Sequence, residues 1–266
     1  MLAHLLICVY FSISSLLVLF LFHVPFLNQF LDYGKTLSNP GVLHTKKTNF
    51  YMFYIAGITS SNLFLVQYIS KTSNLSLLSL QNQDINLEIL LPLILTLIQS
   101  TRRLYECIYI QKSRPDSYMH ITHFICGILF YIILPISLTI GNINTMIPIK
   151  PFPYKFNLII GCILFIYASI SQYKHHLQLS NIRSKSKSKI AIPKRFTVLF
   201  PHYRDEILIY CAVWIASLPN HGLLSWVFNS PFFILVWVIV DLSVSAAIQR
   251  RWYKKNLKTV GLNNFW

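Results

Sequence analysis

Glycine and acidic residues are scarce in this sequence, and both shortages exclude classes of protein. Only 8 of the 266 residues are glycine. No G-x-G-x-x-G run is present, which excludes a Rossmann-type dinucleotide-binding domain. The chain has 8 acidic against 23 basic residues, and charged residues make up 12% of it against 54% hydrophobic residues. Because soluble domains carry about one quarter charged residues, the composition indicates a polytopic membrane protein.

Patterns typical of metal sites and disulfide frameworks are missing as well. Five isolated cysteines lie in or beside apolar stretches: Cys8, Cys107, Cys126, Cys162 and Cys211. We interpret them as reduced packing residues. His175 and His176 are adjacent and would point about 100° apart on a helix, whereas His120 and His123 have helical spacing but no third ligand nearby. We therefore expect His120 and His123 to pack at the membrane edge, and we expect no metal site.

Seven apolar stretches are long enough, or nearly so, to cross a bilayer as helices. They cover residues 5–27, 51–69, 87–109, 121–140, 157–173, 207–227 and 232–248. A hydrocarbon core of about 30 Å needs roughly 20 helical residues. The first stretch is interpreted as a span instead of a signal peptide, because it lacks a basic n-region and no A-x-A-like site follows it. The sequence predicts one all-α membrane domain over residues 1–266.

Basic residues are distributed unevenly between these stretches. With Arg102 and Arg103 counted at the end of the third stretch, the connections after stretches 1, 3 and 5 and the tail carry 3, 4, 8 and 5 Lys and Arg, or 20 of the 23. The positive-inside rule makes this side cytoplasmic, so the amino terminus is lumenal and the carboxy terminus cytoplasmic. The N-x-S/T site at Asn74 falls on the lumenal side, in agreement.

The location of the positive charge also indicates its partners. The basic residues lie in short connections and not on a folded basic domain with interleaved aromatic residues. Anionic membrane lipids or a phosphorylated small molecule are therefore the expected partners, and nucleic acid is not.

A few charged residues lie within or beside the predicted spans, where an unpaired charge is unfavourable. Arg102 and Glu106 are four residues apart, so a helix would pair them. In a second interpretation, the guanidinium groups of Arg103 and Arg114 bind a phosphate. Asp241 lies near the middle of the last stretch, where a carboxyl group is protonated, pairs across helices or lines a polar pocket.

Five segments resemble motifs of the steroid 5-alpha-reductase family, in the family's order and over nearly the whole chain. They are LDYGKT at 31–36, RRLYEC at 102–107, QYKHH at 172–176 running on to NIR at 181–183, PHY at 201–203 with Glu206, and WY at 252–253. The RRLYEC and QYK runs resemble the branch of the family that reduces polyprenal. Met52 and Gln249 depart from that branch, which has His at both places.

The resemblance implies a seven-helix reductase of the endoplasmic reticulum membrane, in dolichol synthesis for protein N-glycosylation. It implies that NADPH is the cofactor, held mainly by residues 150–266, and that a double bond conjugated to a carbonyl group of a polyprenyl lipid is saturated. The implied cofactor-binding residues are Arg103, Arg114, Gln172, His176, Arg183, His202, Glu206 and Tyr253. Tyr54 and Glu106 are the candidates for the group that protonates or hydrogen-bonds the carbonyl oxygen.

Other functions stay open at this stage. A reductase of 3-oxo-4-ene steroids would use the same architecture. A methyltransferase of the isoprenylcysteine type would need an Arg and Glu-Glu pattern after its last spans, which the sequence lacks. A non-enzymatic scaffold or a transporter is the third alternative, although no internal repeat of the kind found in transporters is visible.

Overall fold

The computed structural model describes residues 2–34, 36–37, 41–78, 86–112, 117–143, 156–185, 200–218 and 229–258. The α-helices in this part of the chain are α1 (Leu2–His23), α2 (Tyr51–Leu78), α3 (Leu87–Tyr105), α4 (Ile121–Ile143), α5 (Phe156–Lys185), α6 (Pro201–Ala216) and α8 (Ser230–Lys258). The shorter elements are the 3-10 helices η1 (Pro25–Phe30) and η2 (Lys47–Phe50), the π-helical turn η3 (Glu106–Ile110), and the strands β1 (His44–Lys46) and β2 (Tyr118–His120). The predicted all-helical class is confirmed.

Five helical stretches among the described residues are long and apolar enough to cross a membrane. They are Leu2–His23, Lys47–Ser70, Ile121–Ile140, Phe156–Ser184 and Ser230–Asn256. These correspond to the first, second, fourth, fifth and seventh predicted spans. The helices α3 and α6 have 19 and 16 residues and carry several charged side chains, so length and composition alone do not identify them as spans.

Three helix boundaries differ from the sequence prediction. The sixth stretch was expected over residues 207–227, but α6 begins at Pro201 and ends at Ala216. Proline suits the first turn of a helix, where its missing N–H is not needed, and a second proline at 219 disfavours helical backbone before it. The helix α5 continues to Lys185, so the connection expected after residue 173 begins as helix. The third stretch changes from α to π geometry at Glu106.

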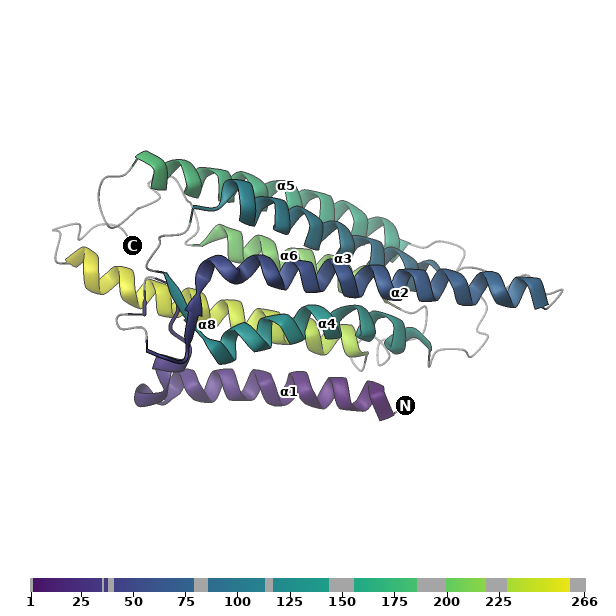
Figure 1. Cartoon of the computed structure of the whole chain (residues 1–266), viewed down its shortest axis with the longest axis horizontal. Coiled ribbons are helices and arrows are strands. Elements are labelled where there is room, and N and C mark those ends of the chain that lie inside the picture. Colours follow the sequence, from purple (N-terminus) through teal and green to yellow (C-terminus); the bar gives the residue numbers. More distant parts are fainter. Residues whose placement is uncertain are drawn as a thin grey trace.

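The helices lie side by side with their axes roughly along the long axis of the molecule (Figure 1). On one side of the bundle α1 packs against α8 and α4, and α4 contacts α2. On the other side α5 lies along α6, and α3 contacts α2, α5 and α6. Because α6 also packs against α8, it joins the two sides.

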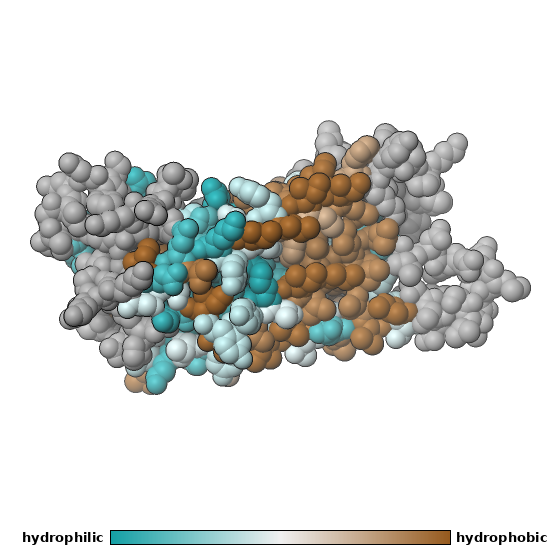
Figure 2. Space-filling view, turned by 90° about the horizontal axis from the view of Figure 1, so that it is seen from above, coloured by the Kyte–Doolittle hydropathy of each residue, from teal (hydrophilic) through white to brown (hydrophobic). Residues whose placement is uncertain are grey.

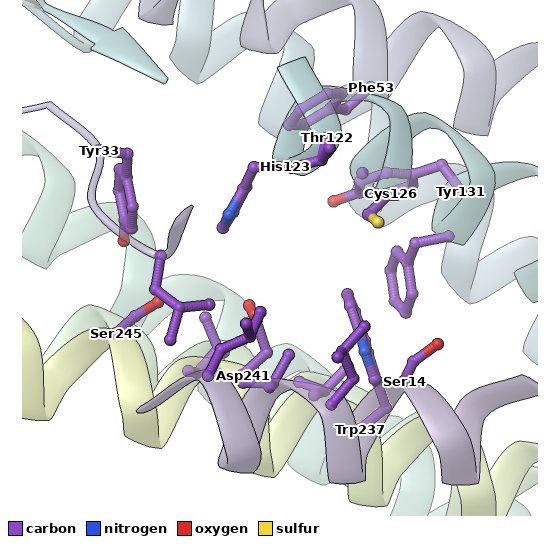
Figure 3. A pocket seen from close by; sticks show the side chains of 18 of the residues that line it. Ser14, Tyr33, Phe53, Thr122, His123, Cys126, Tyr131, Trp237, Asp241 and Ser245 are labelled. Atoms are coloured by element: carbon purple, nitrogen blue, oxygen red, sulfur yellow. The ribbon is translucent and has the colours of Figure 1, made fainter. Parts of the chain in front are cut away.

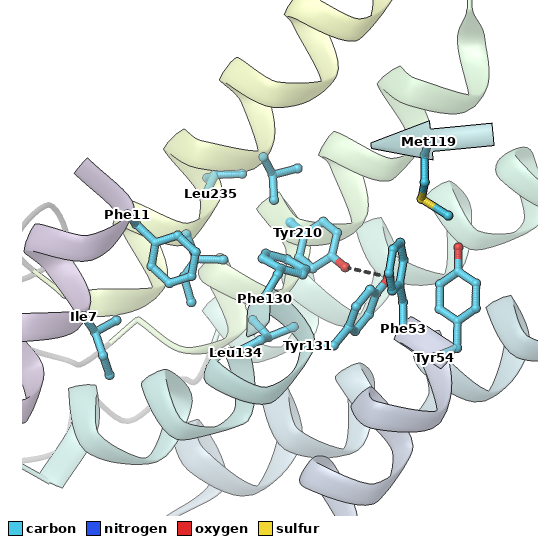
Figure 4. Close-up of a cluster of buried hydrophobic side chains, with 12 residues drawn as sticks. Ile7, Phe11, Phe53, Tyr54, Met119, Phe130, Tyr131, Leu134, Tyr210 and Leu235 are labelled. Carbon is cyan, nitrogen blue, oxygen red and sulfur yellow. Dashed lines mark hydrogen bonds between the residues drawn. The ribbon is translucent and has the colours of Figure 1, made fainter. Parts of the chain in front are cut away.

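Aromatic side chains fill the core between α1, α2, α4, α6 and α8 (Figure 4). The Phe130 ring stacks on Trp237 with centroids 4.9 Å apart, and Phe11 meets Phe130 edge to face at 6.3 Å. The hydroxyl groups of Tyr210 and Tyr131 lie 3.5 Å apart. Aromatic pairs of this kind contribute about 0.5–1.5 kcal/mol each beyond their buried area, so they fix α1, α4, α6 and α8 relative to one another.

A small residue permits the close contact between α5 and α6. A Cβ atom at Gly161 would lie 2.8 Å from the Cβ of Ala216 and 2.9 Å from the carbonyl oxygen of Ala212. Small residues at such points let two helix backbones approach each other, as is common in membrane bundles. The close approach brings the polar residues farther along both helices within hydrogen-bonding distance.

The outer surface of the bundle is largely apolar. Figure 2 shows hydrophobic residues covering one long part of the surface and hydrophilic residues gathered toward one end. The helices α1 and α5 expose large apolar side chains, among them Leu6, Leu16, Ile163 and Ile170. Exposed apolar surface of this extent is typical of a face that contacts lipid.

The two strands form a small antiparallel ribbon that pairs His44 with His120 and Lys46 with Tyr118. It lies at the end of the bundle where α1 ends and where α2 and α4 begin (Figure 1). A bridge between Tyr33 and Met119 attaches the segment after η1 to this ribbon. The ribbon therefore holds Tyr33 at the end of the helix bundle. His120 belongs to the ribbon and not to α4, which corrects the expectation that His120 and His123 share a helical face.

Candidate active site

Most of the predicted site residues converge in one buried polar network between α2, α3, α5 and α6. The predicted members are Tyr54 on α2, Arg103 on α3, Glu106 at the start of η3, Gln172 and His176 on α5, and Glu206 on α6. Residues more than a hundred positions apart in the sequence are thereby in direct contact.

Glu106 is the most buried acidic member, with 0% of its side chain exposed. It forms the expected ion pair with Arg102 and lies 2.6 Å from Nη1 of Arg103. Nδ1 of His176 is 2.5 Å from Oε2, the carboxylate oxygen that Arg103 also contacts. A buried carboxylate is tolerated only when it has several such partners. The π turn, closed by the bond from the Gln111 N–H to the Glu106 carbonyl at 2.7 Å, occurs at this residue, as such turns often do at functional sites.

Arg103 connects the four helices. Its Nη1 lies 2.9 Å from Nδ1 of His176, and its Nη2 donates to the hydroxyl group of Tyr54 at 2.8 Å. The guanidinium group also lies over the Tyr54 ring, 5.1 Å from its centroid. Nε is 3.8 Å from Glu206 and is buried without a hydrogen-bond partner among the described residues. Arg103 is thus directed into the protein.

Glu206 is held by two amide side chains from different helices. Nε2 of Gln99 donates to its carboxylate at 3.2 Å, and Nε2 of Gln172 donates to the other oxygen. Arg102 in turn donates to the amide oxygens of Gln99 at 2.7 Å and of Gln172 at 2.5 Å. Sequence reasoning gave no role to Gln99 or Asp205, although the spacing of Gln99 from Arg103 places both on one face of α3.

Asp205 forms a second buried contact between α5 and α6. Its side chain is 0% exposed and lies 2.6 Å from Nδ1 of His175. Ser171 donates to it at 3.0 Å, and Nη2 of Arg204 lies 2.8 Å away. Asp205 therefore fixes α5 and α6 relative to each other.

His202 and Tyr253 lie at one side of the network. The His202 ring centroid is 5.7 Å from that of His176, and Phe200 lies between His202 and Tyr253, with ring centroids at 6.3 and 6.0 Å. Nδ1 of His202 is buried and has no hydrogen-bond partner among the described residues. The ring therefore presents an unused nitrogen.

Two predicted cofactor residues remain, Arg183 and Arg114. Arg183 is exposed near the end of α5, where Nη1 donates to the carbonyl oxygen of Lys112 at 2.9 Å, so it is not brought into the buried cluster. Arg114 lies outside the described residues.

A cavity of about 290 Å³ adjoins the network between α1, α4, α6 and α8. Its walls are mostly apolar and aromatic, and Figure 3 shows side chains of α1, α4 and α8 around it. Glu206 lines the cavity and also belongs to the network, so it connects the two. Asp241 lines the cavity too. Tyr54 and Glu106 are not among the lining residues; Tyr131, whose ring centroid is 5.5 Å from that of Tyr54, is.

Comparison of the sequence with known proteins identifies relatives of this chain. The polyprenal reductase of Saccharomyces cerevisiae is 34% identical over 161 residues, which cover 60% of this chain and 55% of the yeast protein. The polyprenal reductase of Danio rerio is 24% identical over 265 residues, covering 87% of this chain and 82% of that protein. The polyprenal reductase of Homo sapiens is 25% identical over 191 residues, which cover 65% of this chain and 57% of the human protein.

The matches to the yeast and human proteins therefore span little more than half of the length of those relatives. A family comparison is independent of these pairwise matches. Residues 117–260, more than half of the 266-residue chain, match the family described as 3-oxo-5-alpha-steroid 4-dehydrogenase. The resemblance found in the five sequence segments is confirmed, and the chain belongs to the 3-oxo-5-alpha-steroid 4-dehydrogenase family.

Proposed function

We propose that this protein is an NADPH-dependent reductase that saturates the alpha-isoprene double bond of polyprenal in dolichol synthesis. The observation that carries the proposal is the position of Glu206, whose carboxylate lines the apolar cavity and accepts hydrogen bonds within the buried network. An apolar cavity beside fixed charges suits a lipid whose reacting end is polar. The names of the yeast, zebrafish and human relatives support polyprenal as the substrate.

We also propose that α3 and α6 cross the membrane together with the five longer helices, in the endoplasmic reticulum. Both lie along the same direction as their neighbours (Figure 1), and the charged side chains of Arg103 and Glu206 are only 9% and 14% exposed. Paired charges inside a bundle are the form in which membrane helices tolerate them. The excess of basic residues on one side supports a lumenal amino terminus and a cytoplasmic carboxy terminus.

The polar groups around the network fit a dinucleotide. The unused buried nitrogen of His202, the neighbouring ring of Tyr253 and the side chains of Gln172 and His176 offer aromatic and hydrogen-bonding contacts. Arg183, and Arg114 outside the described residues, are proposed to contact phosphate groups, with Arg103 and Glu206 nearer the reacting end. When bound, NADPH would supply the hydride that adds to the beta carbon of the conjugated aldehyde.

The protein's own contribution is to hold charge near the place where negative charge develops on the aldehyde oxygen. The Arg103 guanidinium is fixed by Glu106, His176 and Tyr54 and needs no rearrangement during the reaction. Preorganised charge of this kind is usually the largest contribution to catalysis. Tyr54 and Glu106 are proposed to act through Arg103, since neither of them lines the cavity.

The size of the cavity supports a substrate whose tail remains in the membrane. Drug-sized ligand sites measure about 300–1,000 Å³, so a cavity of about 290 Å³ holds the head of an isoprenoid but not a long chain. The tail has a large apolar surface that is unfavourable in water. The exposed apolar side chains of α1 next to the cavity, such as Leu17, provide a surface along which such a tail can lie.

The direct test is to incubate membranes that contain the protein with polyprenal and NADPH and to detect the alpha-saturated product by mass spectrometry. We expect product with the wild type and with the control Ser12→Ala, which removes a hydroxyl bonded only to the backbone of α1. Arg103→Ala should lower the rate at least about a hundredfold, the loss seen when an oxyanion-stabilising group is removed. Glu206→Ala should also lower the rate severely, because it removes the acceptor that holds Gln99 and Gln172 in place. Normal rates in both variants would refute the site assignment, and no product from the wild type while a relative is active would refute the function.

A 3-oxo-4-ene steroid is the second candidate substrate, because the matching family is described by a reaction on 3-oxo-5-alpha-steroids. The same membranes are therefore given a 3-oxo-4-ene steroid in a parallel reaction. Faster reduction of the steroid than of polyprenal would reverse the order of the two candidates. Binding of both lipids without turnover would instead favour a non-enzymatic carrier or scaffold.

A further inference from the structure

The cavity has two carboxylates in its wall, and their surroundings differ. Glu206 accepts hydrogen bonds from Gln99 and Gln172 and lies near Arg103. Asp241, in the middle of α8, lines the same cavity and has no hydrogen-bond or ion-pair partner among the described residues. A carboxyl group in a membrane helix is unfavourable unless it is paired or has a function, so the lack of a protein partner requires an explanation.

Among the described residues of the cavity wall, His123 supplies the only imidazole, and it faces this carboxyl group. Figure 3 shows His123 of α4 and Asp241 of α8 on opposite sides of the cavity, with open space between them. Asp241 is close enough to be influenced electrostatically by His123, but within the described part of the chain the two form no direct ion pair. The His123 ring rests against the ring of Tyr33 with centroids 5.3 Å apart, which fixes its orientation.

The polar groups next to this pair already have other partners. The Tyr33 hydroxyl lies 2.6 Å from that of Tyr203, and Nε2 of Gln249 donates to the Tyr33 hydroxyl at 3.3 Å. Lys47 lies over the Tyr33 ring, 5.0 Å from its centroid. Asp241 and His123 thus face each other across the cavity, one as a hydrogen-bond acceptor and the other as a donor.

We propose that His123 and Asp241 bind the terminal oxygen of an isoprenoid head group, an inference that rests on the proposed function. A hydroxyl group both donates and accepts, so an isoprenoid alcohol bridges the pair by donating to Asp241 and accepting from His123. An aldehyde oxygen only accepts, so within this pair only His123 can hydrogen-bond to it. The aromatic and aliphatic wall of the same cavity, including Trp237 on α8 and Leu17 on α1, receives the carbons that follow the oxygen.

This assignment adds a substrate-binding pair on α4 and α8 to the network on α2, α3, α5 and α6. The oxygen end of the lipid is then fixed between α4 and α8, while Glu206 approaches the cavity from α6. An anchored oxygen limits the positions available to the neighbouring double bond, which is the positioning effect that makes bound substrates reactive.

The test measures binding without turnover, using the full-length protein in lipid nanodiscs and no NADPH. The probes are a polyprenol, the corresponding polyprenal and an isoprenoid hydrocarbon of the same length that lacks oxygen. The wild type should bind both oxygen-bearing lipids at least about tenfold more tightly than the hydrocarbon, equivalent to about 1.4 kcal/mol. Ser12→Ala serves as the control and should keep this preference.

Two variants remove the pair while keeping its shape. His123→Phe retains a ring beside Tyr33. It should reduce the affinity for both oxygen-bearing lipids to about the affinity for the hydrocarbon. Asp241→Leu removes an unpaired carboxyl group from a membrane helix, so we expect it to fold, and it should weaken alcohol binding more than aldehyde binding. An unchanged preference in both variants would overturn the proposal, and so would an equal loss of all three lipids, which indicates packing alone.

The binding experiment separates this inference from the proposed reaction. The wild type could prefer the oxygen-bearing lipids, lose this preference in the two variants, and yet reduce no polyprenal. That result would support the binding site and refute the reductase. Reduction of polyprenal by a wild type whose oxygen preference survives in His123→Phe and Asp241→Leu would support the reductase and refute the binding site.

Discussion

Replacement of Glu106 by glutamine should destabilise the protein strongly, because it removes the buried negative charge that pairs with three neighbouring groups. The carboxylate contacts Arg102, Arg103 at 2.6 Å and His176 at 2.5 Å, and its own exposure is 0%. Removing one partner of a buried ion pair typically costs about 3–5 kcal/mol, because the remaining charge stays buried. With a shift of about 2–4 °C per kcal/mol for a chain of roughly this size, we expect the midpoint of thermal unfolding to fall by about 6–20 °C.

The assay is thermal unfolding of the purified protein in detergent, followed by intrinsic fluorescence of its tryptophans. Lys174→Gln is the control, because it also removes one charge but from an exposed position on α5, and its midpoint should stay within about 2 °C of the wild type. A Glu106→Gln midpoint equally close to the wild type would show that the ion pairs contribute little to the folded state. In that case the argument that Arg103 is held rigidly by Glu106 fails.

Two further predictions concern packing and topology. Gly161→Ala should cost about 1–3 kcal/mol in unfolding free energy through overpacking against Ala216, whereas Gly41→Ala, where a Cβ meets nothing closer than 3.7 Å, should be nearly neutral; equal midpoints for the two would contradict the close α5–α6 contact. In sealed microsomes a tag after residue 266 should be digested by added protease and Asn74 should carry a glycan, and a protected tag would reverse the proposed orientation.

Much of the fold could be predicted from hydropathy, because a membrane helix needs a long apolar run and such runs are visible in the sequence. The helices α1, α2, α4, α5 and α8 were found in this way. The start of α6 was missed, because Pro201 to Glu206 is a polar segment that is helical only through its contacts with α5. The extension of α5 past residue 173 was missed for the same reason, since its polar face carries Gln172 and His176 inward.

The candidate site could be predicted only in part. The Arg102–Glu106 pair follows from spacing along one helix, and the structure confirms it. Contacts such as Arg103 with Tyr54 or Gln172 with Glu206 join helices far apart in sequence, so no local pattern encodes them, and the family resemblance was needed to suggest the residues. His123 was expected to pack at the membrane edge, and its place in the cavity wall could not be inferred before α4 and α8 were arranged around it.

The network and the cavity together indicate that the two halves of the chain function as one unit. The family match begins at residue 117, yet Arg103 and Glu106 precede it and are the main partners of His176 and Glu206, which lie within it. A network of buried charges is seldom retained for stability, since well-packed apolar residues in the same place are often as stable or more so. We therefore propose that the buried charges between α3, α5 and α6 serve catalysis. Glu206 belongs to this network and also lines the cavity, which is walled partly by α1. A fragment that contains only the matched region would leave His176 and Glu206 without their arginine, and by this reasoning it would neither fold stably nor form the site.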